Sequence, residues 1–245
     1  MELRVVALYP EQMNIYADRG NILFLQRRCE WRGIGFSYTA SGPAEPIDAD
    51  GHDLIYIGGG QDRDQQMVAA DMVATKRDGL ATAVEDGAVV LAVCGGYQLL
   101  GHSYQLEDER IPGLGIADLE TVREEGPRLI GNVAIEVELD GETLTVAGFE
   151  NHGGRTYLAE GATPLGKVLK GHGNNGKDGF EGVRVRNVFG TYLHGPLLPK
   201  NSVLADRLIA MAIARMEGSA PELEPLDDTL EAEAHRSARA AATQG

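Results

Sequence analysis

The sequence predicts an α/β protein in which a mostly parallel, doubly wound sheet is flanked by helices and extended by an antiparallel hairpin. Apolar runs of strand length occur at residues 54–57 and 89–93, and at residues 3–9, where Arg4 is the one polar residue. Such runs are typical of strands that are buried on both faces of a parallel sheet. Helical patterns separate them, as in doubly wound folds. Alternating apolar and polar residues over 131–150, around an Asp-Gly turn, predict the hairpin.

The first half of the chain supplies the parallel unit. Residues 18–33 predict a helix, because Ile22, Leu25 and Cys29 share one helical face and a glycine ends the pattern. Residues 33–38 predict a weaker strand after it. We expect Cys29 to be a core residue, since free cysteine is among the most buried residue types.

A second helical stretch is expected over residues 62–86, with Gly87 as its stop, and it leads into the apolar run 89–93. Sites in such folds lie at the carboxyl ends of the parallel strands. The residues that directly follow these strands are therefore the first candidates for function.

The second half predicts antiparallel strands and a late helix. Residues 183–195 hold two short strands that end at His194, and the glycine-rich residues 171–179 predict an exposed loop. Ser202 is expected to cap a helix. The inner face of that helix is predicted to carry Leu204, Leu208 and Met211.

We interpret residues 1–217 as one domain. Residues 218–245 form an acidic, then alanine-rich tail, and we expect its last ten residues or so to be frayed. A chain of 245 residues with 43% hydrophobic residues can bury a full core.

Composition excludes several functions. A formal net charge of -15 argues against broad electrostatic binding to nucleic acid or anionic lipid. No apolar stretch reaches membrane-spanning length, and the amino end lacks the basic start and apolar core of a signal peptide, so we expect a cytoplasmic protein. Two cysteines are too few for a disulfide framework, and neither belongs to a cluster with metal-ligand spacing. We therefore expect no disulfide framework and no structural metal site.

Cys94 stands directly after the run 89–93, and helical spacing resumes behind it. Ala92 and Gly96 are the small neighbours that a crowded strand-to-helix bend needs, so this segment matches a nucleophile elbow with cysteine in place of serine. The helix N-terminus also favours a thiolate. We predict that Cys94 is a nucleophile and not merely a buried hydrophobic residue.

A cysteine nucleophile in acyl transfer needs a histidine that takes and returns its proton. His194 follows a strand and comes after the nucleophile in chain order, which favours it. His152, at the end of a hairpin strand, is the alternative. The other four histidines are expected in exposed polar segments, in the flexible loop or on the helix after Cys94: His52, His102, His172 and His235.

Three consecutive glycines, Gly58, Gly59 and Gly60, follow the strand 54–57. They lack the lysine and the spacing of phosphate-binding loops. They could form a tight turn that needs positive φ. Alternatively, their N–H groups face the elbow and stabilise an oxyanion together with the Gly95 N–H. The presence of the elbow favours the second interpretation.

Several segments together resemble the class I glutamine amidotransferases, in the branch with cobyric acid synthase-like glutaminase domains. The resemblance lies, in chain order, in GGGQD, CGGYQLLG, GFENHGGRTYL and GTYLHG. Within that branch, the chain looks most like the glutaminase subunits of lipid II isoglutaminyl synthases in its opening, LYPEQMNIYADRGNILFLQRR, and in PRLIGN. The resemblance covers roughly residues 3–217. Agreement of several spaced motifs is far more specific to a family than any one of these motifs alone.

The resemblance implies hydrolysis of glutamine to glutamate and ammonia, with no cofactor in this chain. Cys94 would form a glutamyl thioester, and His194 would act as base and then as acid. Arg128 would clamp the α-carboxylate of the substrate, for which a planar guanidinium offers bidentate geometry. The implied oxyanion donors and pocket residue are Gly59, Gly60, Gly95 and Gln98.

The resemblance also implies a partner, a MurT-like Mur ligase subunit in a heterodimer with this chain. That subunit would use ATP and the ammonia to amidate the D-glutamate of the lipid II stem peptide in peptidoglycan synthesis. The implied location is cytoplasmic, with peripheral contact to the inner membrane face through the partner's lipid-linked substrate.

Pro196 departs from the family pattern, because many class I glutaminases carry a glutamate two residues after the histidine. We therefore expect the acid that orients His194 to come from the partner chain. Glu150 is the nearest in-chain alternative, since it flanks the strand end that carries His152.

Two other functions remain open. One is a glutaminase that serves a cobyric acid-type cofactor pathway. The other is a binding module that keeps the fold without activity, against which the intact Cys94 and His194 argue.

Overall fold

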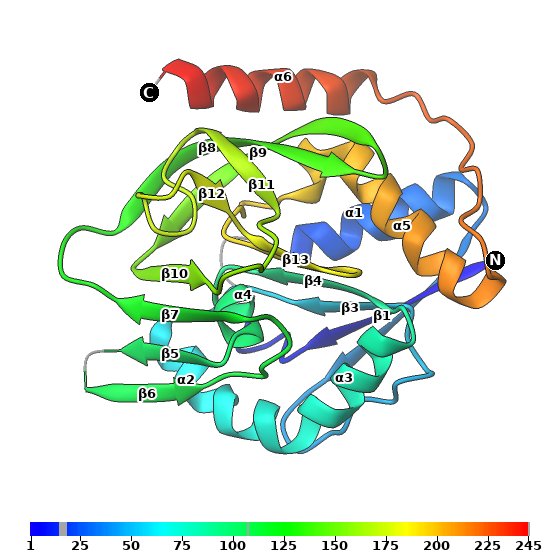
Figure 1. The fold of residues 1–245 in the computed structure, drawn as a ribbon. Helices are drawn as coiled ribbons and strands as arrows, with labels where there is room; N and C mark the ends of the chain where they lie inside the picture. The colour runs from blue at the N-terminus through cyan, green and yellow to red at the C-terminus, as the bar shows by residue number, and fades with distance from the viewer. Residues whose placement is uncertain (15–18, 107, 245) are drawn as a thin grey trace.

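The computed structural model describes residues 1–14, 19–106 and 108–244, and it confirms the predicted fold class (Figure 1). A six-stranded sheet forms the centre. Its strands are β1 (Glu2–Leu8), β2 (Gly35–Ser41), β3 (Leu54–Ile57), β4 (Val89–Val93), β13 (Val183–Val185) and β14 (Val188–Thr191). The strand order is β13-β14-β4-β3-β1-β2, and only β13 runs antiparallel to its neighbour.

Helices cover both faces of this sheet (Figure 1). One face carries α1 (Arg19–Trp31) and α5 (Ser202–Glu217), and the other carries α2 (Asp62–Asp71) and α3 (Arg77–Glu85), joined by a π-helical turn (Met72–Lys76). The short helix α4 (Gly95–Leu100) follows β4. The predicted start of the first helix at residue 18 lies outside the described residues.

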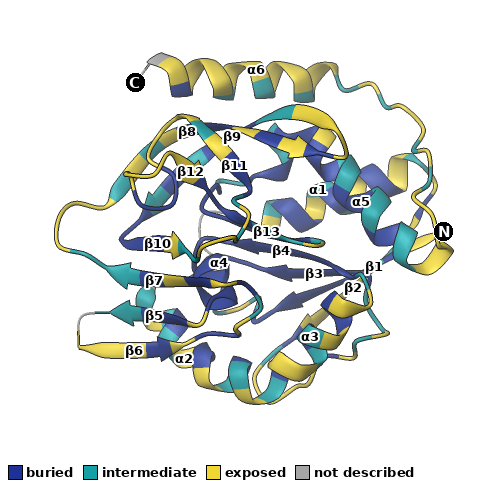
Figure 2. Ribbon diagram, in the orientation of Figure 1, coloured by how far each residue is buried: buried dark blue, intermediate teal, exposed yellow. Residues whose placement is uncertain are grey.

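The central strands are apolar throughout because both of their faces are covered. Every residue of β3 and β4 is buried, as Figure 2 shows.

Cys29 lies on α1 and is fully buried, as predicted. Burial raises the pKa of the Cys29 thiol to about 12, so this thiol is unreactive.

The predicted hairpin consists of β8 (Leu129–Leu139) and β9 (Glu142–His152). Leu139 pairs with Glu142, so Asp140 and Gly141 are the two turn residues. Their φ values of 54° and 80° are those of a type I′ turn, which matches the twist of the strands. Two more strands complete this sheet: β11 (Gly166–Lys170) and β12 (Phe180–Glu181).

A further four-stranded sheet was not predicted. Its strands are β5 (Ser103–Leu106), β6 (Glu109–Pro112), β7 (Leu119–Arg123) and β10 (Gly154–Leu158). The expectation that His102 belongs to the helix after Cys94 was wrong, because α4 ends at Leu100. The half-exposed ring of His102 instead lies with Nε2 3.0 Å from Asp118 Oδ1.

The glycine-rich loop 171–179 is not fully exposed, contrary to prediction. Asn174 and Asn175 are buried. Asn174 Oδ1 accepts hydrogen bonds from the Tyr97 hydroxyl at 3.0 Å and from the Gly182 N–H at 2.7 Å. The loop is therefore fixed against α4, the helix that follows Cys94.

The predicted cap of α5 is displaced by one residue. Asn201 is the N-cap residue, and Ser202 is the first residue of the helix. The Asn201 side chain bridges to β9 instead, since its Oδ1 accepts from the Ala147 N–H and its Nδ2 donates to the Ala147 carbonyl. Leu204 and Leu208 are buried on the inner face, as predicted, and Met211 packs against the core from a partly buried position.

The tail is not frayed, contrary to prediction, because residues 229–244 form helix α6 (Thr229–Gln244) over β8 and β9 (Figure 1). Alanine-rich sequence has high helix propensity. Two side-chain contacts anchor this segment. Asp228 accepts from the fully buried Arg28 at 2.6 Å, and His235 Nδ1 lies 2.8 Å from the Lys200 carbonyl oxygen, so His235 is half-buried rather than exposed.

Arg28 binds a second carboxylate as well. Its Nε donates to Asp206 on α5 at 2.5 Å, so this α1 side chain joins α5 to the tail.

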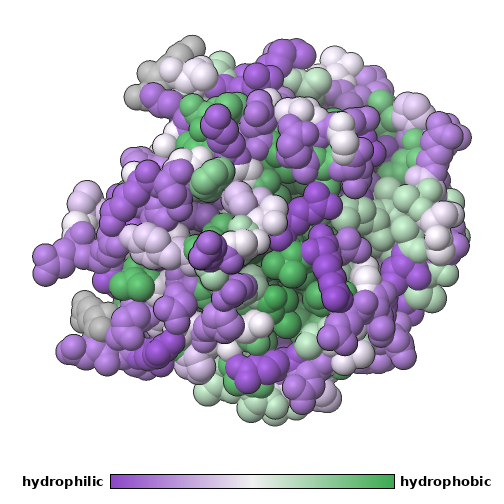
Figure 3. Space-filling model, viewed as in Figure 1, coloured by the Kyte–Doolittle hydropathy of each residue, from purple (hydrophilic) through white to green (hydrophobic). Residues whose placement is uncertain are grey.

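The face seen in Figure 3 is largely hydrophilic, with apolar side chains in smaller patches. No helix within the described part of the chain is long and apolar enough to cross a membrane.

Candidate active site

Cys94 occupies a strained bend between β4 and α4. Its φ of 52° and ψ of -108° are unusual for a residue with a side chain. The Cys94 N–H donates to the Thr191 carbonyl at the end of β14, at 2.8 Å. A Cβ at Gly96 would lie 2.6 Å from the Ile57 carbonyl oxygen, so the bend needs glycine there. The predicted elbow is thus present, with the thiol at the carboxyl edge of the sheet.

Gly60 and Gly95 meet next to this bend. A Cβ at Gly95 would lie 2.9 Å from both the Gly60 nitrogen and the Gly60 oxygen. The turn interpretation of the three glycines was wrong in one respect, since none of them has positive φ. Gly58 is required by crowding instead, because a Cβ there would lie 2.1 Å from the Met13 carbonyl oxygen. The backbone at Gly60 therefore faces the elbow, as an oxyanion site requires.

A cavity of about 300 Å³ opens above the elbow, a size that suits a small ligand. It brings together four predicted site residues, Cys94, Gly60, Gln98 and Arg128. The other predicted site residues, Gly59, Gly95 and His194, are not among the described residues that line the cavity. The remaining lining residues are Gln61, Asp62, Arg63, Gln65, His152 and Gly153.

Gln98 is held at the floor of this cavity by a chain of polar side chains. Its Nε2 donates to the Tyr192 hydroxyl at 3.1 Å, and its Oε1 accepts from Gln65 Nε2 at 2.9 Å. The Tyr192 hydroxyl also shares a hydrogen bond of 2.6 Å with Thr156 Oγ1. All of these side chains are buried, so their positions are set before any ligand enters.

Arg128 stands directly before β8, at the exposed rim of the cavity. Asn151 holds its guanidinium through two hydrogen bonds. Arg128 Nε donates to Asn151 Oδ1 at 2.8 Å, and Nη2 donates to the Asn151 carbonyl oxygen at 2.7 Å. The opposite edge of the guanidinium has the planar fork geometry that a carboxylate accepts.

His194 follows β14 and is fully buried. Its backbone pairs with Phe149 on β9, and the two rings meet edge to face with centroids 5.9 Å apart. Burial is the main cause that lowers the pKa of His194 to about 4, and His152, Lys200 and Arg128 act in the same direction. The imidazole is therefore neutral at physiological pH, which is the form that can accept a proton.

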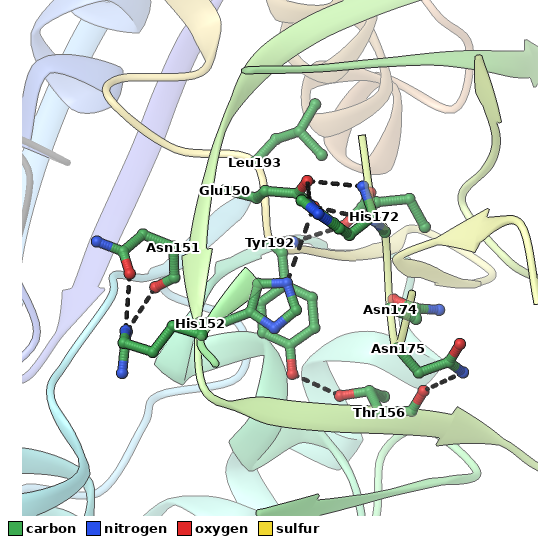
Figure 4. A network of polar contacts seen from close by, with 12 residues as sticks. Glu150, Asn151, His152, Thr156, His172, Asn174, Asn175, Tyr192 and Leu193 are labelled. Atoms are coloured by element: carbon green, nitrogen blue, oxygen red, sulfur yellow. Dashed lines mark hydrogen bonds and ion pairs between the residues drawn. The ribbon is translucent and has the colours of Figure 1, made fainter. Parts of the chain in front are cut away.

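His152, the alternative histidine, lines the cavity and ends β9. Its ring stacks on Tyr192 with centroids 3.5 Å apart (Figure 4). Nδ1 lies 2.8 Å from the Gly154 carbonyl oxygen, which can only accept, so Nδ1 carries the proton. Burial lowers the pKa of His152, against the opposing effect of Glu150, whose carboxylate lies 3.8 Å from Nε2.

Glu150 is buried, lies above His152 in the view of Figure 4 and binds the glycine-rich loop. Its Oε1 accepts from the backbone N–H of His172 and lies 2.7 Å from the His172 ring, while Oε2 accepts from the Gly173 N–H. Burial acts to raise the pKa of Glu150, but the nearby His152 ring and the hydrogen bonds from His172 outweigh it, and the net shift is downward. His172 is thus tied to the site region and is not part of a flexible loop.

Sequence reasoning missed three residues around the cavity. Asn151 lies between two recognised positions in GFENHGG, and strand alternation could have placed it on the face opposite Glu150 and His152. Gln65 and Arg63 lie on the first turns of α2, directly after the glycine segment. Their proximity to that segment was the only signal in the sequence.

The arrangement can support acyl transfer on a small amide. A cysteine on a strained elbow lies next to the closely packed backbone of two glycines, an arginine stands at the rim, and a strand-end histidine follows in the chain. Together with the doubly wound sheet, these features define a protein of the class I glutamine amidotransferase type.

Comparisons with known proteins agree with that class. The chain belongs to the family of CobB/CobQ-like glutamine amidotransferase domains, whose family model matches residues 4–202. A chain in the structure of PurLQS from Thermotoga maritima has the same fold, with a TM-score of 0.56 and 20% identity, over 89% of this chain and 99% of that one.

Curated relatives include two subunits of the same kind. The GatD subunit of the glutamine-hydrolyzing lipid II isoglutaminyl synthase of Streptococcus pneumoniae is 39% identical over 95% of this chain and 88% of its own length. The GatD subunit from Staphylococcus aureus is 40% identical over 95% of this chain and 93% of its own length. The cobyric acid synthase of Pelotomaculum thermopropionicum is 32% identical over 79% of this chain and 37% of its own length.

Proposed function

We propose that this chain is the glutaminase subunit of a lipid II isoglutaminyl synthase. The observation that carries the proposal is the elbow cysteine, Cys94, opposite the Gly60–Gly95 backbone in a cavity whose rim holds Arg128. Near full-length similarity to two GatD subunits supports the choice of acceptor.

In the first half-reaction, the Cys94 sulfur attacks the side-chain carboxamide carbon of glutamine. The carbonyl oxygen becomes an oxyanion that accepts from backbone N–H groups of Gly60 and Gly95, with Gly59 as the further candidate donor. The C–N bond then breaks as His194 returns the thiol proton to the leaving nitrogen. Ammonia leaves, and a glutamyl thioester remains on Cys94.

In the second half-reaction, His194 takes a proton from water, and the hydroxide adds to the thioester carbon. The C–S bond breaks, glutamate leaves and the thiol regains its proton. Arg128 holds the α-carboxylate throughout, and Gln98 shapes the floor of the pocket. The net reaction converts glutamine and water into glutamate and ammonia.

A partner subunit completes the proposal. We infer that an ATP-dependent, MurT-like Mur ligase receives the ammonia and amidates the D-glutamate of lipid II. We also propose that this partner supplies the acid that orients His194. Pro196 occupies the position of an in-chain glutamate, and the Glu150 carboxylate is engaged by His172 and Gly173.

The runner-up is a glutaminase for cobyric acid-type amidation, which the similarity to cobyric acid synthases supports. This chain corresponds to 37% of the length of that synthase but to 88% and 93% of the two GatD subunits. The comparison therefore favours lipid II as the final acceptor.

The test reconstitutes the chain with the ATP-dependent partner and follows glutamate release and amidation of lipid II. We expect both products with glutamine as nitrogen source. A Cys94→Ala variant should lose both with glutamine but amidate lipid II when ammonium is supplied. Amidation of a corrinoid acid in place of lipid II would transfer the proposal to the runner-up, and glutamine-dependent amidation by Cys94→Ala would refute it.

A further inference from the structure

Gln65, which lines the active-site cavity, has an unused hydrogen-bond acceptor. The residue lies on the second turn of α2, lines the cavity and is only 2% exposed. Its Oε1 is buried and has no hydrogen-bond partner within the described residues. Buried polar atoms are nearly always satisfied, so an orphan acceptor on a cavity-lining residue indicates a donor that the ligand brings.

The direction of the Gln65 amide follows from its neighbours. The Gly60 carbonyl oxygen, which can only accept, lies 3.4 Å from Nε2, and Gln98 Oε1 lies 2.9 Å from the same atom. Exchanging the amide nitrogen and oxygen of Gln65 would set oxygen against oxygen at Gly60. Nε2 therefore faces the protein, and Oε1 is the atom left for a ligand.

This amide also lies beside the glycine pair of the elbow. A Cβ at Gly95 would lie 3.0 Å from Gln65 Nε2 and 2.9 Å from the Gly60 nitrogen, so all three groups converge on one point. If the Gly60 and Gly95 N–H groups hold the oxygen of a substrate carboxamide, the nitrogen of that carboxamide is bonded to the same carbon. Gln65 Oε1 is bonded to the same carbon as Nε2, so this acceptor lies next to the place where the amide N–H arrives.

We propose that Gln65 Oε1 accepts a hydrogen bond from the carboxamide N–H of glutamine and makes the cavity selective for an amide over an acid. The proposal rests on the proposed glutaminase function. A carboxylate at the same place offers only lone pairs to Oε1, so the product glutamate fits worse than the substrate. Gln65 thus favours binding of glutamine and release of glutamate.

The experiment measures ligand binding to a Cys94→Ala protein, in complex with its partner subunit, by calorimetry. The ligands are glutamine and its γ-methyl ester, which keeps the carbonyl but lacks the N–H. We expect glutamine to bind about 3- to 10-fold more tightly than the ester, the range of one neutral hydrogen bond. Adding Gln65→Met, which keeps the length and removes the acceptor, should abolish this preference.

The neighbouring residue provides a matched control. Gln66 points away and donates to Glu109 Oε2 at 2.6 Å, so Gln66→Met should leave the preference unchanged. Glutaramate, which lacks the α-ammonium, distinguishes the two donors of glutamine. If Gln65→Met weakens glutaramate as much as glutamine, the carboxamide is the donor. If glutaramate binding is unaffected by Gln65→Met, the α-ammonium is the donor and the proposal is overturned.

Kinetic measurements distinguish the proposed role of Gln65 from a merely structural one. In the active complex, Gln65→Met should lower kcat/KM for glutamine about 3- to 10-fold while inhibition by glutamate stays equal or tightens. Equal weakening of both ligands would overturn the proposal, as would equal binding of glutamine and ester to Cys94→Ala protein with Gln65 intact. Failure of that protein to bind glutamine at all would instead overturn the proposed function, and this inference with it.

Discussion

Replacing Asn151 by alanine should weaken glutamine binding without slowing the chemistry. The change removes the acceptor that holds Arg128 Nε at 2.8 Å and leaves the backbone acceptor of Nη2 at 2.7 Å. A hydrogen bond to a charged group contributes about 1.5–3 kcal/mol, and the exposure of Arg128 places this one at or below the lower limit. About 1–1.5 kcal/mol corresponds to a KM for glutamine raised roughly 5- to 10-fold. Asn151 is expected to act on ground-state binding through Arg128, so kcat should stay within about twofold.

A double-mutant cycle tests the cause. A lysine cannot reproduce the fork of Arg128, so Arg128→Lys alone should raise KM at least as much as Asn151→Ala. In the Arg128→Lys background, Asn151→Ala should then add less than about a factor of two. Asn187→Ala is the control, since Asn187 donates to the Gly87 carbonyl at 2.9 Å, outside the cavity-lining set. Fully additive effects, or a loss confined to kcat, would refute the reasoning that Asn151 acts by orienting Arg128.

Three further changes have defined outcomes. Cys94→Ser should lower glutamine hydrolysis by about 10⁴-fold or more, and Cys29→Ser should leave it nearly intact; a labelled glutamyl adduct trapped on Cys29 would contradict the assignment. The isolated chain should hydrolyse glutamine slowly, with the partner raising the rate by up to roughly 10⁴-fold through the acid that orients His194; full activity of the isolated chain would exclude donation in trans. Burial raises the pKa of Glu181 to about 8 from 4.5, so between these pH values the folded chain holds a proton that the unfolded chain has lost. The stability that this group contributes is therefore present below pH 4.5 and lost as pH rises through about 8. In the unchanged protein, the free energy of unfolding should fall by up to about 1.4 kcal/mol per pH unit across this window, and Glu181→Gln should remove this fall. Urea titrations at several pH values measure it, and an equal dependence of the unfolding free energy on pH in both proteins would count against the prediction.

The sequence was most informative where one physical requirement acts on consecutive residues. β3 and β4 are buried on both faces, so their apolar runs identified them directly. The crowded bend at Cys94 requires small neighbours, and Gly96 revealed it. The Asp-Gly turn of the hairpin was equally local, because both of its residues adopt positive φ.

Contacts between distant segments could not be predicted in the same way. β5 pairs in parallel with β7 and antiparallel with β6, and such short strands carry too few residues for a clear alternation. Glu150 was considered as a partner of His194, yet its carboxylate binds His172, 22 residues further along. Gln65 lies within a helix and acquires its position only from packing against the elbow.

The two carboxylates around Arg28 bear on how the chain folds as it is synthesised. Asp206 and Asp228 lie 178 and 200 residues after the arginine that they bind. A guanidinium buried without its counterions is strongly unfavourable, so α1 cannot settle in its final place until almost the whole chain has left the ribosome. Contacts of such long sequence separation also slow folding. We therefore expect the last step of folding to occur after translation ends, and a chain terminated before residue 228 to remain exposed to chaperones and proteases.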